Sequence, residues 1–187
     1  MKAGIGLANT LTALRGLLIA PLVWAIYQSD FLLAAVVFTL AVITDLVDGP
    51  IARARNEVSV LGGIFDHSVD ALFVAAGLLA LVLFGAQLVV PWGLPVLVVL
   101  SFTQYALDSK VLAGRALRAS ALGRYNGIGY FVVLGIALIG AVVFEALGLS
   151  RALLAQLVNL CGWLLVVTTL LSMLDRLLAY RTARGSP

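Results

Sequence analysis

Four aspartates lie close together in a strongly apolar chain, within the stretch TDLVDGPIARARNEVSVLGGIFDHSVD of residues 44–70. An ionised carboxylate inside a membrane costs on the order of several kcal/mol unless it meets a cation or water, so such residues usually mark function. On a helix, the spacings i,i+3 and i,i+4 place two side chains on one face. Each pair of this aspartate quartet therefore shares a face: Asp45 with Asp48, and Asp66 with Asp70.

The aspartate quartet predicts a divalent-metal site. If the two helices that carry it pack as neighbours through their short connector, the four carboxylates converge. Four like charges beside a low-dielectric medium cannot all stay ionised unless cations neutralise them. Carboxylate oxygens suit Mg²⁺ or Mn²⁺, whereas one histidine and one distant cysteine disfavour zinc. A single aspartate near a helix end could instead reach the interface or pair with Arg53 or Arg55, but two matched faces disfavour that interpretation for all four.

Small and basic residues flank the quartet. Gly49 and Gly62 remove side chains beside the carboxylates and let another helix or a flat ligand come close, although glycines also serve ordinary packing of membrane helices. Arg53 lies one turn after Gly49, where a guanidinium can hold a phosphate oxygen. The combination points to an anionic ligand beside the metal site.

Composition indicates which elements must position these residues. Of 187 residues, 63% are hydrophobic and 11% are charged, with a mean hydropathy of +1.12, whereas roughly a quarter of the residues in soluble proteins are charged. No segment alternates with the period of two that a barrel strand requires. We predict an all-α polytopic membrane protein that forms one domain over residues 1–187. Hydropathy predicts six transmembrane helices, over residues 11–28, 31–53, 60–86, 92–112, 122–145 and 152–179.

Basic residues predict the orientation in the membrane. Six helices place both termini on one side, and eleven of the twelve Lys and Arg residues fall at that set of helix ends, with only Arg151 at the other. Because cytoplasmic segments carry the excess of Lys and Arg, both termini and the aspartate quartet are predicted to face the cytosol, in a multi-pass protein of the cell (cytoplasmic) membrane. The eleven residues are Lys2, Arg15, Arg53, Arg55, Lys110, Arg115, Arg118, Arg124, Arg176, Arg181 and Arg184.

The same stretch resembles the signature of the CDP-alcohol phosphotransferases. That signature reads Asp, two residues, Asp-Gly, two residues, Ala-Arg, eight residues, Gly, three residues, Asp, three residues, Asp. The chain matches it without a gap, at Asp45, Asp48, Gly49, Ala52, Arg53, Gly62, Asp66 and Asp70. The segment NTLTALRG of residues 9–16 is similar to the opening of many members. There Arg15 has either a functional role or only that of an anchor on the positive side.

This resemblance implies a transferase of phospholipid synthesis. Such enzymes move a phosphatidyl group from a CDP-linked donor, usually CDP-diacylglycerol, to the hydroxyl of an acceptor alcohol and release CMP. By the family pattern the ligands of two divalent ions are Asp45, Asp48 and Asp66. Asp70 would be the general base and would also touch a metal. The pocket for the donor nucleotide and diphosphate would consist of Gly49, Ala52, Arg53 and Gly62.

The acceptor is less well defined by the sequence. Where many phosphatidylglycerophosphate and cardiolipin synthases carry Asp-Pro, two residues, Asp-Lys, this chain has His67 for Pro and Ala71 for Lys, which weakens both assignments. A basic segment, which either captures an anionic acceptor or only faces anionic lipid, favours an alcohol phosphate such as glycerol 3-phosphate. Its candidate acceptor-binding residues are Arg115, Arg118, Ser120 and Arg124. An inositol phosphate, serine or an unphosphorylated alcohol stays open as an alternative acceptor.

A cation transporter is the competing functional class, because intramembrane aspartates also build transport sites. Transporters usually show inverted repeats and acidic residues near the bilayer midplane, whereas here the acids cluster at one face. The expected partners are therefore a CDP-linked lipid donor, a small polar alcohol acceptor and membrane lipids, with no nucleic acid. Similarity to related enzymes also implies a homodimer.

Overall fold

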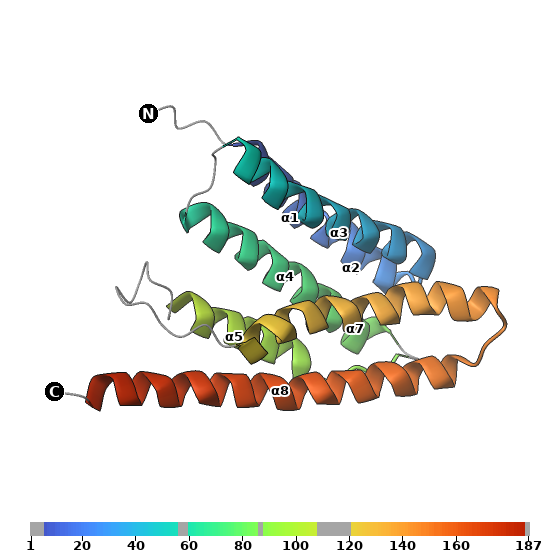
Figure 1. Cartoon of the computed structure of the whole chain (residues 1–187). Coiled ribbons are helices and arrows are strands. Elements are labelled where there is room, and N and C mark those ends of the chain that lie inside the picture. The colour runs from blue at the N-terminus through green and yellow to red at the C-terminus, as the bar shows by residue number, and fades with distance from the viewer. Residues whose placement is uncertain (1–5, 56–59, 86–87, 108–120, 186–187) are drawn as a thin grey trace.

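The computed structural model describes residues 6–55, 60–85, 88–107 and 121–185, and all its regular elements in these ranges are helices (Figure 1). The predicted all-α class is thus confirmed. The helices are α1 (Leu7–Leu17), α2 (Ile19–Tyr27), α3 (Phe31–Ala54), α4 (Val60–Phe84), α5 (Leu94–Leu107), α7 (Ala121–Ala146) and α8 (Arg151–Gly185).

Predicted and observed helices differ most at the two ends of the chain. The predicted helix 152–179 begins at Arg151 and continues to Gly185. The predicted helices 31–53 and 122–145 fall within one residue of α3 and α7. The predicted helix 11–28 instead begins at Leu7 and is divided at Leu18 into α1 and α2. At the division the Leu18 amide donates to the carbonyls of both Leu14 and Arg15, at 3.1 Å each, which tightens the last turn of α1. Pro21 follows closely and has no N–H to donate to the Leu17 carbonyl.

Five helical stretches of the described residues are long and apolar enough to cross a membrane. They are Asn9–Tyr27, Phe31–Ala54, Gly62–Phe84, Ala121–Ala146 and Arg151–Leu178. The 14 residues of α5 rise about 21 Å, less than the roughly 30 Å of a hydrocarbon core. The predicted helix 92–112 continues beyond Leu107 into residues outside the described part of the chain. Leucines such as Leu171, Leu174 and Leu178 are about half exposed on α8, as expected of side chains that face lipid.

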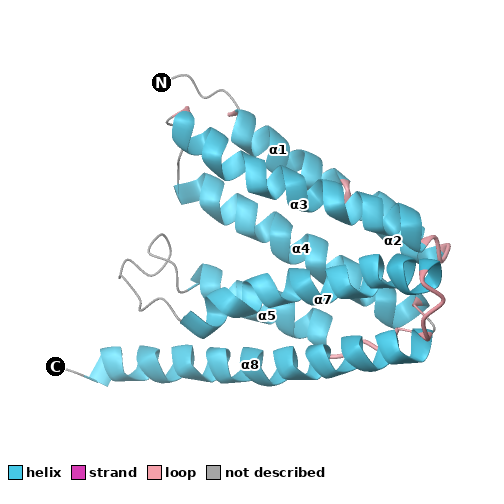
Figure 2. Ribbon diagram, turned by 45° about the vertical axis from the view of Figure 1, so that its right-hand side comes forward, coloured by secondary structure: helices cyan, strands magenta, loops and turns pink. Residues whose placement is uncertain are grey.

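The helices form two groups that share one polar end. Figure 2 shows α1, α2, α3 and α4 on one side and α5, α7 and α8 on the other, and the two groups are packed together through α4 against α5 and α3 against α7. In Figure 1 the start of α1, the end of α3 and the start of α4 lie at the left, as do the end of α5, the start of α7 and the end of α8. The opposite end holds the tight α7–α8 connection, where Gly148 adopts a left-handed φ of 65°.

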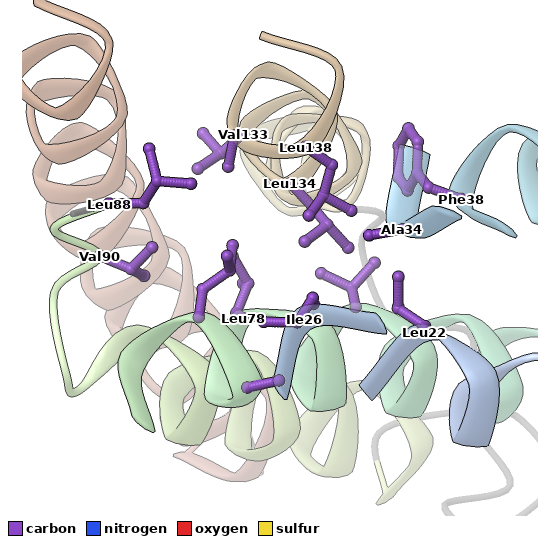
Figure 3. Close-up of a cluster of buried hydrophobic side chains, with 14 of the residues drawn as sticks. Leu22, Ile26, Ala34, Phe38, Leu78, Leu88, Val90, Val133, Leu134 and Leu138 are labelled. Carbon is purple, nitrogen blue, oxygen red and sulfur yellow. The ribbon is translucent and has the colours of Figure 1, made fainter. Parts of the chain in front are cut away.

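Buried apolar side chains fix the two groups to each other away from that polar end. Leu22 of α2, Leu78 of α4 and Leu134 of α7 are fully buried within one cluster (Figure 3). Gly77 lets α4 approach closely, because a Cβ there would lie 2.9 Å from the Leu134 side chain and 3.1 Å from that of Leu22. The core thereby sets the relative position of α3, α4 and α7 at the polar end.

Helix α1 lies between the two helices that carry the aspartate quartet. It packs extensively against both α3 and α4, whereas α3 and α4 make few close backbone contacts with each other over the described residues. The expectation that these two helices pack directly through their connector is therefore wrong. The aspartates still meet, but they meet around a side chain that α1 supplies.

Candidate active site

The aspartate quartet converges on the guanidinium of Arg15. Nη1 of Arg15 lies 3.2 Å from Asp45 Oδ1 and 3.1 Å from Asp66 Oδ1. The same nitrogen forms an ion pair with Asp70, and Nη2 forms one with Asp48. The Arg15 side chain is fully buried. The predicted convergence of the four carboxylates is thus confirmed, and the buried guanidinium of Arg15 lies at its centre.

Thr12 completes the contribution of α1. Its hydroxyl donates to Oδ1 of Asp66 at 3.2 Å, and Thr12 is 3% exposed. Thr12 precedes Arg15 by three residues, so both side chains lie on one face of α1. Arg15 also lies in the last turn of α1, where a cation interacts favourably with the helix dipole. In the sequence, the three-residue spacing of Thr12 and Arg15 is the pattern that indicates a shared contact, and both residues contact Asp66.

Exposure is graded across the quartet. The exposed fraction of the side chain rises from 7% for Asp48 through 19% for Asp70 and 26% for Asp66 to 38% for Asp45. The site is therefore closed on the side of Asp48 and open on the side of Asp45. A charged ligand can reach the carboxylates from the open side, while the deep carboxylate is shielded from water.

Two overlapping groups of side chains have the spacing of metal ligands. Asp45, Asp48 and Asp66 each offer an oxygen, and these atoms all lie within 4.8 Å of one another. Asp66, Asp70 and the imidazole of His67 form a second group with the same spacing. Asp66 belongs to both groups. The first group offers only oxygens, which fits Mg²⁺ or Mn²⁺, and the acidic cluster can thus bind a divalent ion.

The predicted donor residues lie within about two helical turns of the quartet, on α3 and α4. The Arg53 guanidinium folds back over Gly49, since a Cβ at Gly49 would lie 3.6 Å from Arg53 Nη1 and 3.8 Å from Nη2. Ala52 and Gly62 are half-buried nearby in the sequence, at the end of α3 and the start of α4. Arg53 itself is exposed. A guanidinium above a surface without side chains can hold a phosphate group against the helix.

The predicted acceptor residues are described only in part. Arg115, Arg118 and Ser120 lie outside the described residues. Arg124 lies in the first turn of α7 and is exposed. The basic segment that the sequence singled out is therefore represented in the structure by this one arginine.

A second polar group lies on α5, α7 and α8, and the sequence predicted only its Asn126 as a neutral donor to an anionic acceptor. The guanidinium carbon of Arg176 lies 5.4 Å from the centre of the Tyr105 ring, and that ring packs edge-on against His67 at 5.8 Å. A Cβ at Gly123 would collide with the Arg176 guanidinium, so α7 is close to it. Asn126 is 3% exposed, and its Nδ2 has no hydrogen-bond partner among the described residues. In the sequence, Arg176 had no signal beyond its place among the basic helix ends.

The sequence is similar to those of known proteins. The profile of the family described as CDP-alcohol phosphatidyltransferase matches residues 5–174. The chain is 37% identical over 84 residues to a CDP-diacylglycerol–glycerol-3-phosphate 3-phosphatidyltransferase of Rickettsia felis. The matched segment covers 43% of this chain and 46% of that protein. It is 39% identical over 77 residues to the protein of the same name from Rickettsia prowazekii, covering 40% and 42%.

The matched part thus spans less than half the length of these curated relatives. No solved structure is significantly similar to the chain.

Proposed function

The chain belongs to the CDP-alcohol phosphatidyltransferase family, and from that premise we propose that it transfers a phosphatidyl group from CDP-diacylglycerol to glycerol 3-phosphate. It is an integral membrane protein, as its family and its apolar helices indicate. The observation that carries the proposal is the gathering of four signature carboxylates at one point, with Arg53 folded over Gly49 beside them. The acceptor follows from the names of the two curated relatives.

The proposed reaction is a single displacement at phosphorus. The acceptor hydroxyl oxygen forms a bond to the phosphorus that carries the diacylglycerol, and the bond from that phosphorus to the CMP oxygen breaks. The hydroxyl proton passes to the carboxylate of Asp70, and CMP leaves. Asp70 suits this role because its side chain is largely shielded, yet it lies beside His67, whose ring packs against Tyr105 of α5.

Two divalent ions, Mg²⁺ or Mn²⁺, fit the quartet. Asp45, Asp48 and Asp66 would hold one ion, and Asp66 with Asp70 would hold the second. When bound, such ions neutralise the diphosphate and stabilise the leaving phosphate oxygen. The chain's own contribution is to hold these carboxylates on two helices, α3 and α4, at spacings that would allow the Asp66 carboxylate to be shared.

The donor and acceptor would occupy different sides of the quartet. Gly49, Ala52, Arg53 and Gly62 would bind the nucleotide and diphosphate on the α3 and α4 side. The acceptor phosphate would lie towards α7 and α8, where Arg124 and Arg176 are near the polar end. The predicted residues Arg115, Arg118 and Ser120 would join them from the segment between α5 and α7.

The membrane topology completes the proposal. We propose six transmembrane spans in one domain over residues 1–187, with α5 as the shortest span and α1 and α2 together as the first. Both termini and the quartet would face the cytosol, in the cytoplasmic membrane, because the basic residues gather at that set of helix ends. The active form would be a homodimer, by analogy with related enzymes.

The test is CMP release by the purified full chain with CDP-diacylglycerol and Mg²⁺. Glycerol 3-phosphate is compared with inositol 1-phosphate, inositol, serine and other small alcohols, and release that depends on glycerol 3-phosphate is expected. Release with another alcohol alone would keep the family activity and correct the acceptor. A folded protein that neither binds CDP-diacylglycerol nor releases CMP, but carries a cation across liposome membranes, would instead be a transporter.

A further inference from the structure

We propose that Arg15 is an internal counter-cation that shares the carboxylates of the quartet with the divalent ions and so weakens their binding. This inference rests on the metal site of the proposed function and assigns a positioning role to a residue outside the family signature of residues 45–70. Arg15 acts through the carboxylates, by holding them together and by competing for their oxygens.

The contacts of Arg15 coincide with those that an ion needs. Its two terminal nitrogens reach all four aspartates, and Nη1 alone contacts Asp45, Asp66 and Asp70. Asp45, Asp48 and Asp66 are also the group whose oxygens lie within 4.8 Å of one another. A guanidinium and a divalent ion that use the same carboxylates carry like charge at close range, so each must weaken the binding of the other.

The burial of Arg15 makes this competition strong. The side chain is fully buried, and its Nε has no hydrogen-bond partner among the described residues. The guanidinium is therefore held by the aspartates and not by water, and it cannot be screened by solvent as a surface arginine is. Since α1 packs against both α3 and α4, the packing of these three helices places Arg15 among the aspartates.

The same contacts give Arg15 a stabilising role when no divalent ion is bound. Four carboxylates on α3 and α4 repel one another unless a cation lies among them. Arg15 supplies that cation and keeps the ligands near their final positions, so that α1, α3 and α4 stay packed without metal. A purely structural arginine would stabilise the fold in the same way, but its removal would damage the ion site rather than strengthen it.

The test compares Arg15→Gln with the wild type, using the full chain in nanodiscs after removal of metal with EDTA. Binding of Mn²⁺ is followed by the electron paramagnetic resonance signal of free Mn²⁺, and unfolding by thermal melting with and without Mn²⁺. Arg15→Gln should bind Mn²⁺ about tenfold more tightly or better, because a charge among the ligands has been removed. It should melt at a lower temperature in EDTA and gain more from Mn²⁺ than the wild type does.

Arg15→Lys is the matched control. Lysine keeps the positive charge but lacks the planar fork that reaches several carboxylates at once. Its Mn²⁺ affinity should stay within about threefold of the wild type, while part of the stability in EDTA is lost. This pattern separates the effect of the positive charge on Mn²⁺ affinity from the effect of the planar guanidinium on the stability of the fold.

The outcomes distinguish this inference from the proposed function. A folded Arg15→Gln protein that binds Mn²⁺ no more tightly than the wild type would overturn the inference and leave the metal site intact. If Arg15→Gln melts during purification in EDTA, Mn²⁺ should restore its folding, and failure to fold with Mn²⁺ would also overturn it. A folded wild type that binds no Mn²⁺ at all would instead remove the metal site from the proposed function.

Discussion

The two groups of helices present opposite chemistry at their shared polar end. On α1, α3 and α4, four carboxylates surround one buried guanidinium. On α5, α7 and α8, the guanidinium of Arg176 lies over the Tyr105 ring, near the neutral side chain of Ser172. An anion cannot approach the first group unless cations screen the carboxylates, whereas it can approach the second directly. We call α1, α3 and α4 the donor half and α5, α7 and α8 the acceptor half, after the substrate proposed to bind to each. Binding of the donor should therefore depend on metal, and binding of the acceptor should not.

The largest effect is expected from Asp48→Asn, which removes the deepest charge of the donor half. Turnover should fall about 10³-fold or more, because the ion that stabilises the leaving group loses a ligand. Mn²⁺ binding should weaken in parallel, while acceptor affinity changes little. The measurements are CMP release at saturating substrates and Mn²⁺ titration.

The matched control for Asp48→Asn is Asp30→Asn on the same helix. Asp30 is exposed and caps α3 by accepting a hydrogen bond from the Leu33 amide at 2.9 Å, a role that asparagine also fills. Asp30→Asn should retain turnover. Unchanged metal binding in a folded Asp48→Asn protein would break the comparison between the two halves.

Asp70→Asn tests the place where the two halves meet. The substitution removes the proposed base while keeping the size of the side chain, so kcat should fall about 10²- to 10⁴-fold. Binding of CDP-diacylglycerol should persist, because the main donor contacts lie on α3 and at the start of α4. Binding is measured on the same preparation as turnover, and substantial CMP release would contradict the role of Asp70.

Arg53→Gln sharpens the comparison on the donor side alone. Loss of a charge-assisted hydrogen bond to phosphate costs about 1.5–3 kcal/mol, so the KM for CDP-diacylglycerol should rise roughly 10- to 100-fold. The KM for the acceptor should stay the same. Arg55→Gln, an exposed residue just past the end of the same helix, is the control and should leave both constants near the wild type. A rise in the acceptor KM instead would mean that Arg53 binds the acceptor and not the donor.

The difference between the halves also explains what the sequence could predict. The quartet and the Gly49–Arg53 pair are short-range patterns within helices, and helical geometry alone brings each pair to one face. The all-α class and most helix bounds likewise follow from local hydropathy. These features depend on the chain near each residue, and the structure confirms them.

Features that depend on packing between distant helices were not predictable in this way. Nothing in residues 44–70 indicates that α1 lies between α3 and α4, because the short connector suggests direct contact of those two helices. The sequence left two roles open for Arg15, and only the fold puts its buried guanidinium among four carboxylates. Arg176 similarly becomes a candidate only through its contact with the ring of Tyr105, which lies on a helix far from it in the sequence.

Arg176→Gln tests the acceptor half. If Arg176 binds the acceptor phosphate, its loss should raise the KM for glycerol 3-phosphate about tenfold, with no change in donor or Mn²⁺ affinity. Arg151→Gln is the matched control, since Arg151 lies at the opposite end of α8, paired with Glu145 at 2.5 Å. Equal effects of Arg176→Gln on the KM values for donor and acceptor would show that the two substrates do not bind to separate halves.

The smallest effect is expected from Tyr130→Phe, which probes how the acceptor half is held together. The Tyr130 hydroxyl and the Thr169 hydroxyl form a buried hydrogen bond of 2.6 Å between α7 and α8. Its loss should lower the free energy of unfolding by about 1 kcal/mol or less, since a threonine hydroxyl on a helix can turn to a carbonyl of the preceding turn. Unfolding by SDS in mixed micelles measures this, with the exposed Tyr125→Phe on the same helix as control. Because this hydrogen bond is neutral and involves none of the quartet, the decrease should be the same with and without Mn²⁺. A decrease that Mn²⁺ reverses would mean that the two halves are coupled through the metal.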